Sequence, residues 1–213
     1  MYKYILFDLD GTLTDPGRGI TNSVAYALNK FGIDVADKKE LYKFIGPPLT
    51  DSFEKYYGFS SDEAITAVEY YREYFKPKGI YENEIYQGVP ELLKALKENG
   101  KTVILATSKP EIFAKEILKY FSIDKYFDFV AGATLDKSRT KKGDVIAYAL
   151  KSCNITDKSD CLMVGDREQD INGAIANGID SLGVLYGYGD IAELSNAKST
   201  YIAKKVEDII KYV

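Results

Sequence analysis

Short apolar runs recur along the chain, and each ends in polar residues. They are nearly continuous in apolar residues rather than alternating, which is typical of parallel strands covered on both faces. From residue 88 onward, segments with apolar residues at helical spacing lie between these runs. This alternation predicts an α/β fold with a doubly wound, mostly parallel sheet. The predicted strands are residues 4–8, 102–107, 161–166 and 181–185, with 127–132 as a weaker candidate.

Helix boundary residues support the segments between the strands. Pro90 lies near the start of one segment and Gly100 at its end, as is common for helices. Gly178 occupies a C-cap position in another. The tail, residues 201–213, predicts a last short strand and a closing helix. The helices predicted in this part are residues 88–101, 109–123, 143–155 and 170–179.

The stretch 17–79 breaks the alternation, because it carries helical patterns only. Ser60 or Ser61, together with Glu63, forms a capping pattern before the last of them. Glycines and prolines separate the predicted helices, residues 21–32, 38–46, 49–58 and 61–75. We therefore predict an α/β core domain, residues 1–16 and 80–213, that contains the catalytic site, and an inserted helical cap domain, residues 17–79.

Composition narrows the class of protein. The formal net charge of −4, with both signs scattered along the chain, argues against nucleic acid or an anionic membrane as the partner. No apolar run is long enough to span a bilayer, and the first run ends at Asp8, unlike a signal peptide. Cys153 and Cys161 make no disulfide framework, so we expect a cytoplasmic protein in which Cys161 is a small buried hydrophobe.

The chain contains no histidine, which excludes several kinds of chemistry. Ser-His-Asp and Cys-His catalysis are ruled out, and so are histidine-rich or thiolate zinc sites. A general acid or base must then be a carboxylate, Lys, Tyr or Cys. A bound metal would have oxygen ligands, which favours Mg²⁺ or a similar hard cation.

Polar residues follow the predicted strands, at the edge where open α/β sheets bind ligands. Four carboxylates cannot share one partly buried site as bare anions, since each unpaired charge would cost roughly several kcal/mol. A divalent cation on oxygen ligands would resolve this repulsion and would favour a phosphoryl group as a further ligand. The residues that this edge brings together are Asp8, Asp10, Thr107, Ser108, Lys142, Asp166 and Asp170.

These segments resemble the four motifs of the haloacid dehalogenase superfamily. They are "DLDGTLTD", "ILATSKP", a lysine before a helix, and "GDREQD", in that order. The resemblance extends from residue 4 to about residue 190, and the D-x-D-G-T spacing is that of the phosphatases. The helical insert resembles the cap of the phosphoglycolate phosphatase-like branch. "FIGPPL" and "SRTKKGDVI" further resemble bacterial 5′-nucleotidase-like members.

The resemblance implies a role for each motif residue. Asp8 would be the nucleophile that forms an aspartyl-phosphate, and Asp10 would transfer the proton. Mg²⁺ would be bound by Asp8, the backbone carbonyl of Asp10 and Asp166, with Asp170 holding it through water or from the second shell. The phosphate-binding residues would be Thr107, Ser108 and Lys142.

Two positions depart from the family pattern. The motif lysine is often followed by Pro, whereas this chain has "TKKGD", so Lys141 is an alternative to Lys142. Ser108 stands where Asn is common in this branch. In the predicted cap, Arg18 and Gly46 are candidate substrate contacts. Their alternatives are a surface charge for Arg18 and a plain helix connector for the "GPPL" loop.

We therefore expect a Mg²⁺-dependent phosphatase that acts on a small phosphorylated metabolite, of the phosphoglycolate or nucleoside 5′-monophosphate class. The protein would be a monomer or a weak homodimer. A phosphosugar mutase of the β-phosphoglucomutase type is an alternative, and a non-catalytic binding module is another. A dehalogenase is disfavoured, because such an enzyme needs no second carboxylate at Asp10.

Overall fold

The structure, a computed structural model, describes residues 2–136 and 138–213, which form two compact units. One unit runs up to Thr14 and continues as Ile85–Val213, and the other is Asp15–Glu84. The expected domain boundaries were residues 16 and 79, and the role of the second unit as a catalytic cap stays a prediction. Residues 1 and 137, which fall in the expected core domain, lie outside the described residues.

The first unit is built on a six-stranded sheet with the order β5-β4-β1-β6-β7-β8. Every pair of neighbouring strands is parallel, which confirms the predicted fold class. β1 lies between β4 and β6, so the polar residues that end these three strands meet at one edge. The strands are β1 (Tyr4–Phe7), β4 (Thr102–Pro110), β5 (Phe129–Ala133), β6 (Cys161–Gly165), β7 (Asp180–Val184) and β8 (Tyr201–Ala203).

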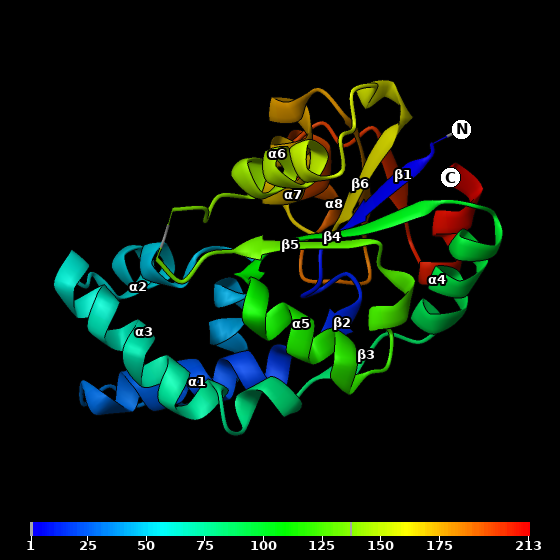
Figure 1. The fold of residues 1–213 in the computed structure, drawn as a ribbon. Helices are drawn as coiled ribbons and strands as arrows, with labels where there is room; N and C mark the ends of the chain where they lie inside the picture. The colour runs from blue at the N-terminus through cyan, green and yellow to red at the C-terminus, as the bar shows by residue number, and fades with distance from the viewer. Residues whose placement is uncertain (1, 137) are drawn as a thin grey trace. The chain divides into compact units, whose positions relative to one another are not determined.

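Helices cover both faces of this sheet. Figure 1 shows α6 and α7 on one face and α4 and α5 on the other. All four were predicted, and Gly178 is the left-handed C-cap of α7. The α-helices of the unit are α4 (Val89–Glu98), α5 (Glu111–Tyr120), α6 (Lys142–Ser152), α7 (Glu168–Asn177) and α8 (Ile191–Asn196).

Two details of this unit differ from the prediction. The closing helix is a 3₁₀ helix, η5 (Val206–Tyr212), and not an α-helix, because a short helical pattern does not distinguish the two kinds of hydrogen bonding. The short α8 was not predicted. It begins at the Asp190 side chain, which accepts a hydrogen bond from Glu193 N at 2.8 Å. Two further 3₁₀ turns of this unit are η3 (Asp124–Tyr126) and η4 (Lys158–Asp160), whereas η2 (Gly79–Tyr81) belongs to the second unit.

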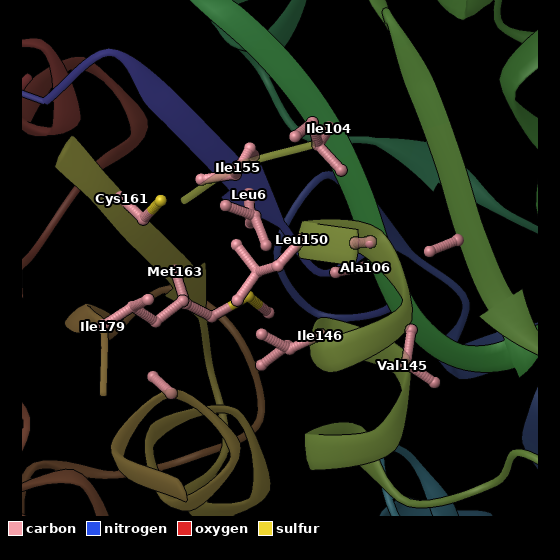
Figure 2. Packing of buried hydrophobic residues seen from close by; sticks show 13 residues of the cluster. Leu6, Ile104, Ala106, Val145, Ile146, Leu150, Ile155, Cys161, Met163 and Ile179 are labelled. Carbon is pink, nitrogen blue, oxygen red and sulfur yellow. The ribbon is translucent and has the colours of Figure 1, made fainter. Parts of the chain in front are cut away.

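A buried cluster joins the sheet to α6 and α7. Figure 2 shows Ile146 and Leu150 of α6 lying over Leu6 and Met163 of the sheet. Such burial stabilises by about 1.5–3 kcal/mol for each large apolar side chain. Cys161 belongs to the cluster and is fully buried, and this burial raises the pKa of its thiol to about 11. The expectation of a small buried hydrophobe at Cys161 is confirmed.

The second unit is helical. Its α3 begins at Ser60, which forms a capping box with Glu63, as predicted. The predicted helix at 38–46 is a 3₁₀ helix, η1 (Lys38–Phe44), that begins at the capping side chain of Asp37. The α-helices are α1 (Gly17–Lys30), α2 (Leu49–Tyr57) and α3 (Ser61–Phe75). Short strands β2 (Thr14–Asp15) and β3 (Glu84–Ile85) pair where the chain passes between the units. Among the described residues, none of the helices is long and apolar enough to cross a bilayer.

Candidate active site

Asp8 and Asp10 lie at the end of the central strand, on a tight turn. Asp8 N donates to Val164 O at 2.9 Å, so pairing with β6 continues one residue past β1. Leu9 O accepts hydrogen bonds from three following amides, which closes the turn. Gly11 has a φ of +84°, a conformation that glycine adopts without steric cost. Both carboxylates are buried, with Asp8 4% exposed and Asp10 8% exposed.

Lys142 lies between two of the carboxylates. It begins α6, and its Nζ is 2.7 Å from Asp8 Oδ1 and 2.7 Å from Asp170 Oδ1. Nζ also donates to Ala106 O at 3.1 Å. Burial opposes the charged ammonium, but the neighbouring Asp170 and Asp8 carboxylates outweigh it and raise the pKa of Lys142. Lys141 is exposed, so Lys142 is the lysine that lies with the carboxylates.

Asp166 and Asp170 complete the cluster from β6 and α7. Asp166 Oδ2 accepts from Tyr188 N at 2.7 Å, and Oδ1 accepts from Thr12 Oγ1 at 3.3 Å. Burial and then the nearby carboxylates raise the pKa of Asp166 well above its ordinary value. Burial also raises the pKa of Asp170 to about 6, although the neighbouring Lys142 ammonium lowers it. The two carboxylates are therefore costly as bare anions.

Three of the carboxylates fit a divalent cation. One oxygen each from Asp8, Asp166 and Asp170 lies within 4.8 Å of the others, and all three residues are buried. In addition, Asp10 Oδ1 is buried without a hydrogen-bond partner in the described part of the chain. An all-oxygen donor set of this kind suits a hard cation. The cluster is thus compatible with a divalent metal, as the sequence led us to expect.

Asp10 is paired with a residue that the sequence analysis did not assign to the site. Lys109 Nζ donates to Asp10 Oδ2 at 2.5 Å, and both side chains are buried. Burial raises the pKa of Asp10 although Lys109 lowers it. In the sequence, only the place of Lys109 among the polar residues after the predicted strand 102–107 pointed to the site. The rule that side chains two residues apart share a strand face does not apply here, because the register of β4 shifts between Ala106 and Pro110.

Thr107 and Ser108 lie at the same edge of the sheet. Thr107 is buried and its Oγ1 accepts from Lys109 N at 3.2 Å, whereas Ser108 is partly buried. Arg18 and Gly46 belong to the second unit, so their contact with substrate stays a prediction. Arg18 is exposed on α1 and lines a pocket of about 370 Å³ within that unit. Gly46 has a φ of +105° and precedes the Pro47-Pro48 pair.

Replacing Gly11 with Ala is expected to lower the catalytic activity of this site by about 100-fold, because misplacing a reacting group by about 1 Å can cost that much. A Cβ on Gly11 would lie 2.2 Å from Asp166 Oδ2, so the Asp166 carboxylate or the turn must move. Gly32→Ala is the matched control, because its φ is also positive at +73° but its Cβ would meet open space. Equal loss of activity in both variants, at equal thermal stability, would contradict this account of Gly11.

Comparison with known proteins places this geometry in a family. The model of haloacid dehalogenase-like hydrolases matches residues 5–184. A 5′-nucleotidase of Pseudomonas aeruginosa is 48% identical over 200 residues, covering 94% of this chain and 90% of that protein. Tyrosine-protein kinase PtkA of Mycobacterium tuberculosis is 38% identical over 201 residues, covering 94% of this chain and 68% of that protein.

Solved structures agree with the family match. The crystal structure of a predicted phosphatase from Clostridium acetobutylicum superposes with a TM-score of 0.97 at 50% identity, covering 100% of this chain and 98% of that one. The shared sheet, the carboxylate cluster and the phosphatases among the relatives identify the chain as an enzyme that cleaves phosphomonoesters. The protein belongs to the haloacid dehalogenase-like hydrolases and is a phosphatase of that family.

Proposed function

We propose that the protein is a Mg²⁺-dependent phosphatase that hydrolyses phosphomonoesters of small metabolites through an aspartyl-phosphate on Asp8. The observation that carries the proposal is the pairing of Asp8 with Lys142, at 2.7 Å, beside the buried Asp166 and Asp170. A phosphoryl group on Asp8 would lie next to the Lys142 ammonium, whose positive charge would offset the negative charge of the phosphoryl oxygens. The proposed site also includes the hydroxyls of Thr107 and Ser108.

In the first proposed step, a carboxylate oxygen of Asp8 attacks the phosphorus atom and the bond to the leaving oxygen breaks. Lys142, with the Thr107 hydroxyl, holds the phosphoryl oxygens and stabilises the charge that they carry. Asp10 gives its proton to the leaving alcohol. Burial, which raises the pKa of Asp10, favours the protonated form that this step needs.

In the second proposed step, water attacks the phosphorus of the aspartyl-phosphate. Asp10, now ionised, removes a proton from that water, and the Asp8 carboxylate leaves. Lys109, at 2.5 Å from Asp10, stabilises the ionised form of Asp10 between the two steps. The net reaction consumes one phosphomonoester and one water and gives one alcohol and one inorganic phosphate.

Mg²⁺ would be held by the side chains of Asp8 and Asp166 and by the backbone carbonyl of Asp10, with Asp170 holding it through water or from the second shell. When bound, the ion supplies positive charge that offsets the carboxylates and the phosphoryl group. The donor set of three buried carboxylates supports this assignment.

The substrate class that we propose is phosphoglycolate or a nucleoside 5′-monophosphate. Relatives of the chain are named 5′-nucleotidase and phosphoglycolate phosphatase. Arg18 and Gly46, in the proposed cap, are the substrate contacts that we assign outside the core. Cytoplasmic location and a monomeric or weakly dimeric state complete the proposal.

Release of inorganic phosphate from a panel of phosphorylated metabolites tests this function. We expect turnover with Mg²⁺ and a loss of at least about 100-fold after chelation, restored by added Mg²⁺, because a bound metal offsets several kcal/mol of charge in such sites. Isomerisation of a sugar phosphate without phosphate release would indicate a mutase. Phosphorylation of a protein substrate would indicate a kinase, which is the activity in the name of one relative. Binding without any turnover would indicate a binding module.

A further inference from the structure

The segment after β7 lies against the candidate site, although no motif of the sequence analysis included it. Tyr186 OH donates to Thr12 O at 2.9 Å. Tyr188 N donates to Asp166 Oδ2 at 2.7 Å. The segment 186–189 therefore contacts both the Asp10–Thr12 turn and the Asp166 carboxylate.

Close packing holds this segment against Asp166. A Cβ on Gly187 would lie 2.3 Å from Gly11 O and 2.5 Å from Asp166 Oδ2. A Cβ on Gly189 would lie 1.9 Å from Asp166 O. Neither approach tolerates a side chain, so the backbone of the segment fits directly around Asp166.

Tyr186 contributes the side-chain contact between this segment and the Asp10–Thr12 turn. Its ring packs edge-on against Tyr86, with ring centroids 5.1 Å apart and an interplanar angle of 68°. Tyr86 N in turn donates to Leu13 O at 3.1 Å. The backbone carbonyls of Thr12 and Leu13 therefore both accept hydrogen bonds from these two tyrosines, while the Thr12 hydroxyl donates to Asp166 Oδ1 at 3.3 Å.

We propose that Tyr186 is a positioning residue for the cation-binding carboxylates, acting through Thr12 on Asp166. The proposal rests on the proposed function, because it assigns Asp166 as a metal ligand. The Tyr186 hydroxyl holds the Thr12 backbone, Thr12 Oγ1 orients Asp166 Oδ1, and Tyr188 N orients Asp166 Oδ2. Hydrogen bonds of this kind fix the direction in which a ligating carboxylate presents its oxygens.

If Tyr186 had only a structural role, replacing it would have a different effect on Mg²⁺ binding. In that case its hydroxyl would contribute to folding as any buried hydrogen bond does, and metal affinity would not change. Tyr2 supplies the comparison. Its hydroxyl donates to Asp180 Oδ2 at 2.7 Å, and Tyr2 precedes β1, at the edge of the sheet away from the carboxylates.

The test measures Mg²⁺ binding to the substrate-free protein by titration calorimetry, with Mn²⁺ and its electron paramagnetic resonance signal as a second probe. For Tyr186→Phe we expect affinity about three- to tenfold weaker than wild type, which is below the 10- to 100-fold loss typical for direct partners of metal ligands. Tyr2→Phe should bind Mg²⁺ as wild type does. Thermal unfolding of both variants measures the loss of stability separately.

A double-mutant cycle tests the route through Thr12. Thr12→Val should also weaken Mg²⁺ binding, and adding Tyr186→Phe to it should weaken binding little further, because both changes interrupt one chain of contacts. Wild-type affinity in Tyr186→Phe, or equal weakening in Tyr2→Phe, would overturn the proposal. Failure of the wild-type protein to bind Mg²⁺ would instead overturn the proposed function.

Discussion

Replacing Asp8 with Asn should abolish phosphatase activity, with kcat lowered by at least about 10⁴-fold, as is typical when an enzyme loses its nucleophile. The amide keeps the shape of the carboxylate but lacks the nucleophilic oxygen anion. The variant should still fold, because one negative charge is removed from a buried cluster that holds Asp166 and Asp170 as well. Phosphate release from an aryl phosphate, at saturating Mg²⁺, measures the effect.

Asp144→Asn is the matched control for this variant. Asp144 is an exposed carboxylate in the first turn of α6, two residues after Lys142. Its replacement makes the same change of charge near the site, and we expect activity within about twofold of wild type, since an exposed charge is screened by water. Substantial turnover by Asp8→Asn, or equal loss in both variants, would contradict the role of Asp8.

Replacing Asp166 with Asn should have the second-largest effect. We expect activity at 1 mM Mg²⁺ to fall by about 10³-fold, because the lost carboxylate is a proposed metal ligand and transition-state electrostatics account for losses of this size. The metal-free variant should be at least as stable as metal-free wild type at pH 7. Burial and the neighbouring Asp170 raise the pKa of Asp166, so its charge is unfavourable in the folded protein.

Thermal unfolding with and without Mg²⁺ separates these effects. At a metal concentration about 100 times Kd, wild type gains about 2.7 kcal/mol of stability, which corresponds to a Tm rise of roughly 5–10 °C. Asp166→Asn should lose most of this rise, while the Asp144→Asn control keeps it. A metal-dependent rise of wild-type size in Asp166→Asn would show that the ion binds elsewhere.

The strands that precede Asp8 and Asp166 were predicted from the sequence, because each is a short, nearly continuous apolar run, which is typical of a parallel strand covered on both faces. The structure places Lys142 beside Asp8 and Asp170 and the alternative, Lys141, at the surface, so the geometry favours Lys142, while its phosphate-binding role stays a prediction. These features depend on local patterns and on residues at the ends of strands.

Other features depend on contacts between distant segments. The Lys109–Asp10 pair joins residues 99 positions apart, and the Tyr186–Thr12 hydrogen bond joins residues 174 positions apart. The spacing of apolar residues along the chain carries no information about such long-range contacts. The 3₁₀ form of Lys38–Phe44 was missed for another reason, because short helical patterns do not distinguish 3₁₀ from α-helical hydrogen bonding.

The most direct test of the central claim is to trap the phosphoryl group on Asp8. In Asp10→Asn, an aryl phosphate, whose leaving group needs no protonation, should still phosphorylate the enzyme. Hydrolysis of the intermediate should be slowed by about 10²- to 10⁴-fold, because the base that activates water is missing. Mass spectrometry of the acid-quenched variant should then find one phosphoryl group, on the peptide that contains Asp8. A phosphoryl group on another residue, or slow turnover with no phosphorylated enzyme in a quench-flow time course, would contradict the account.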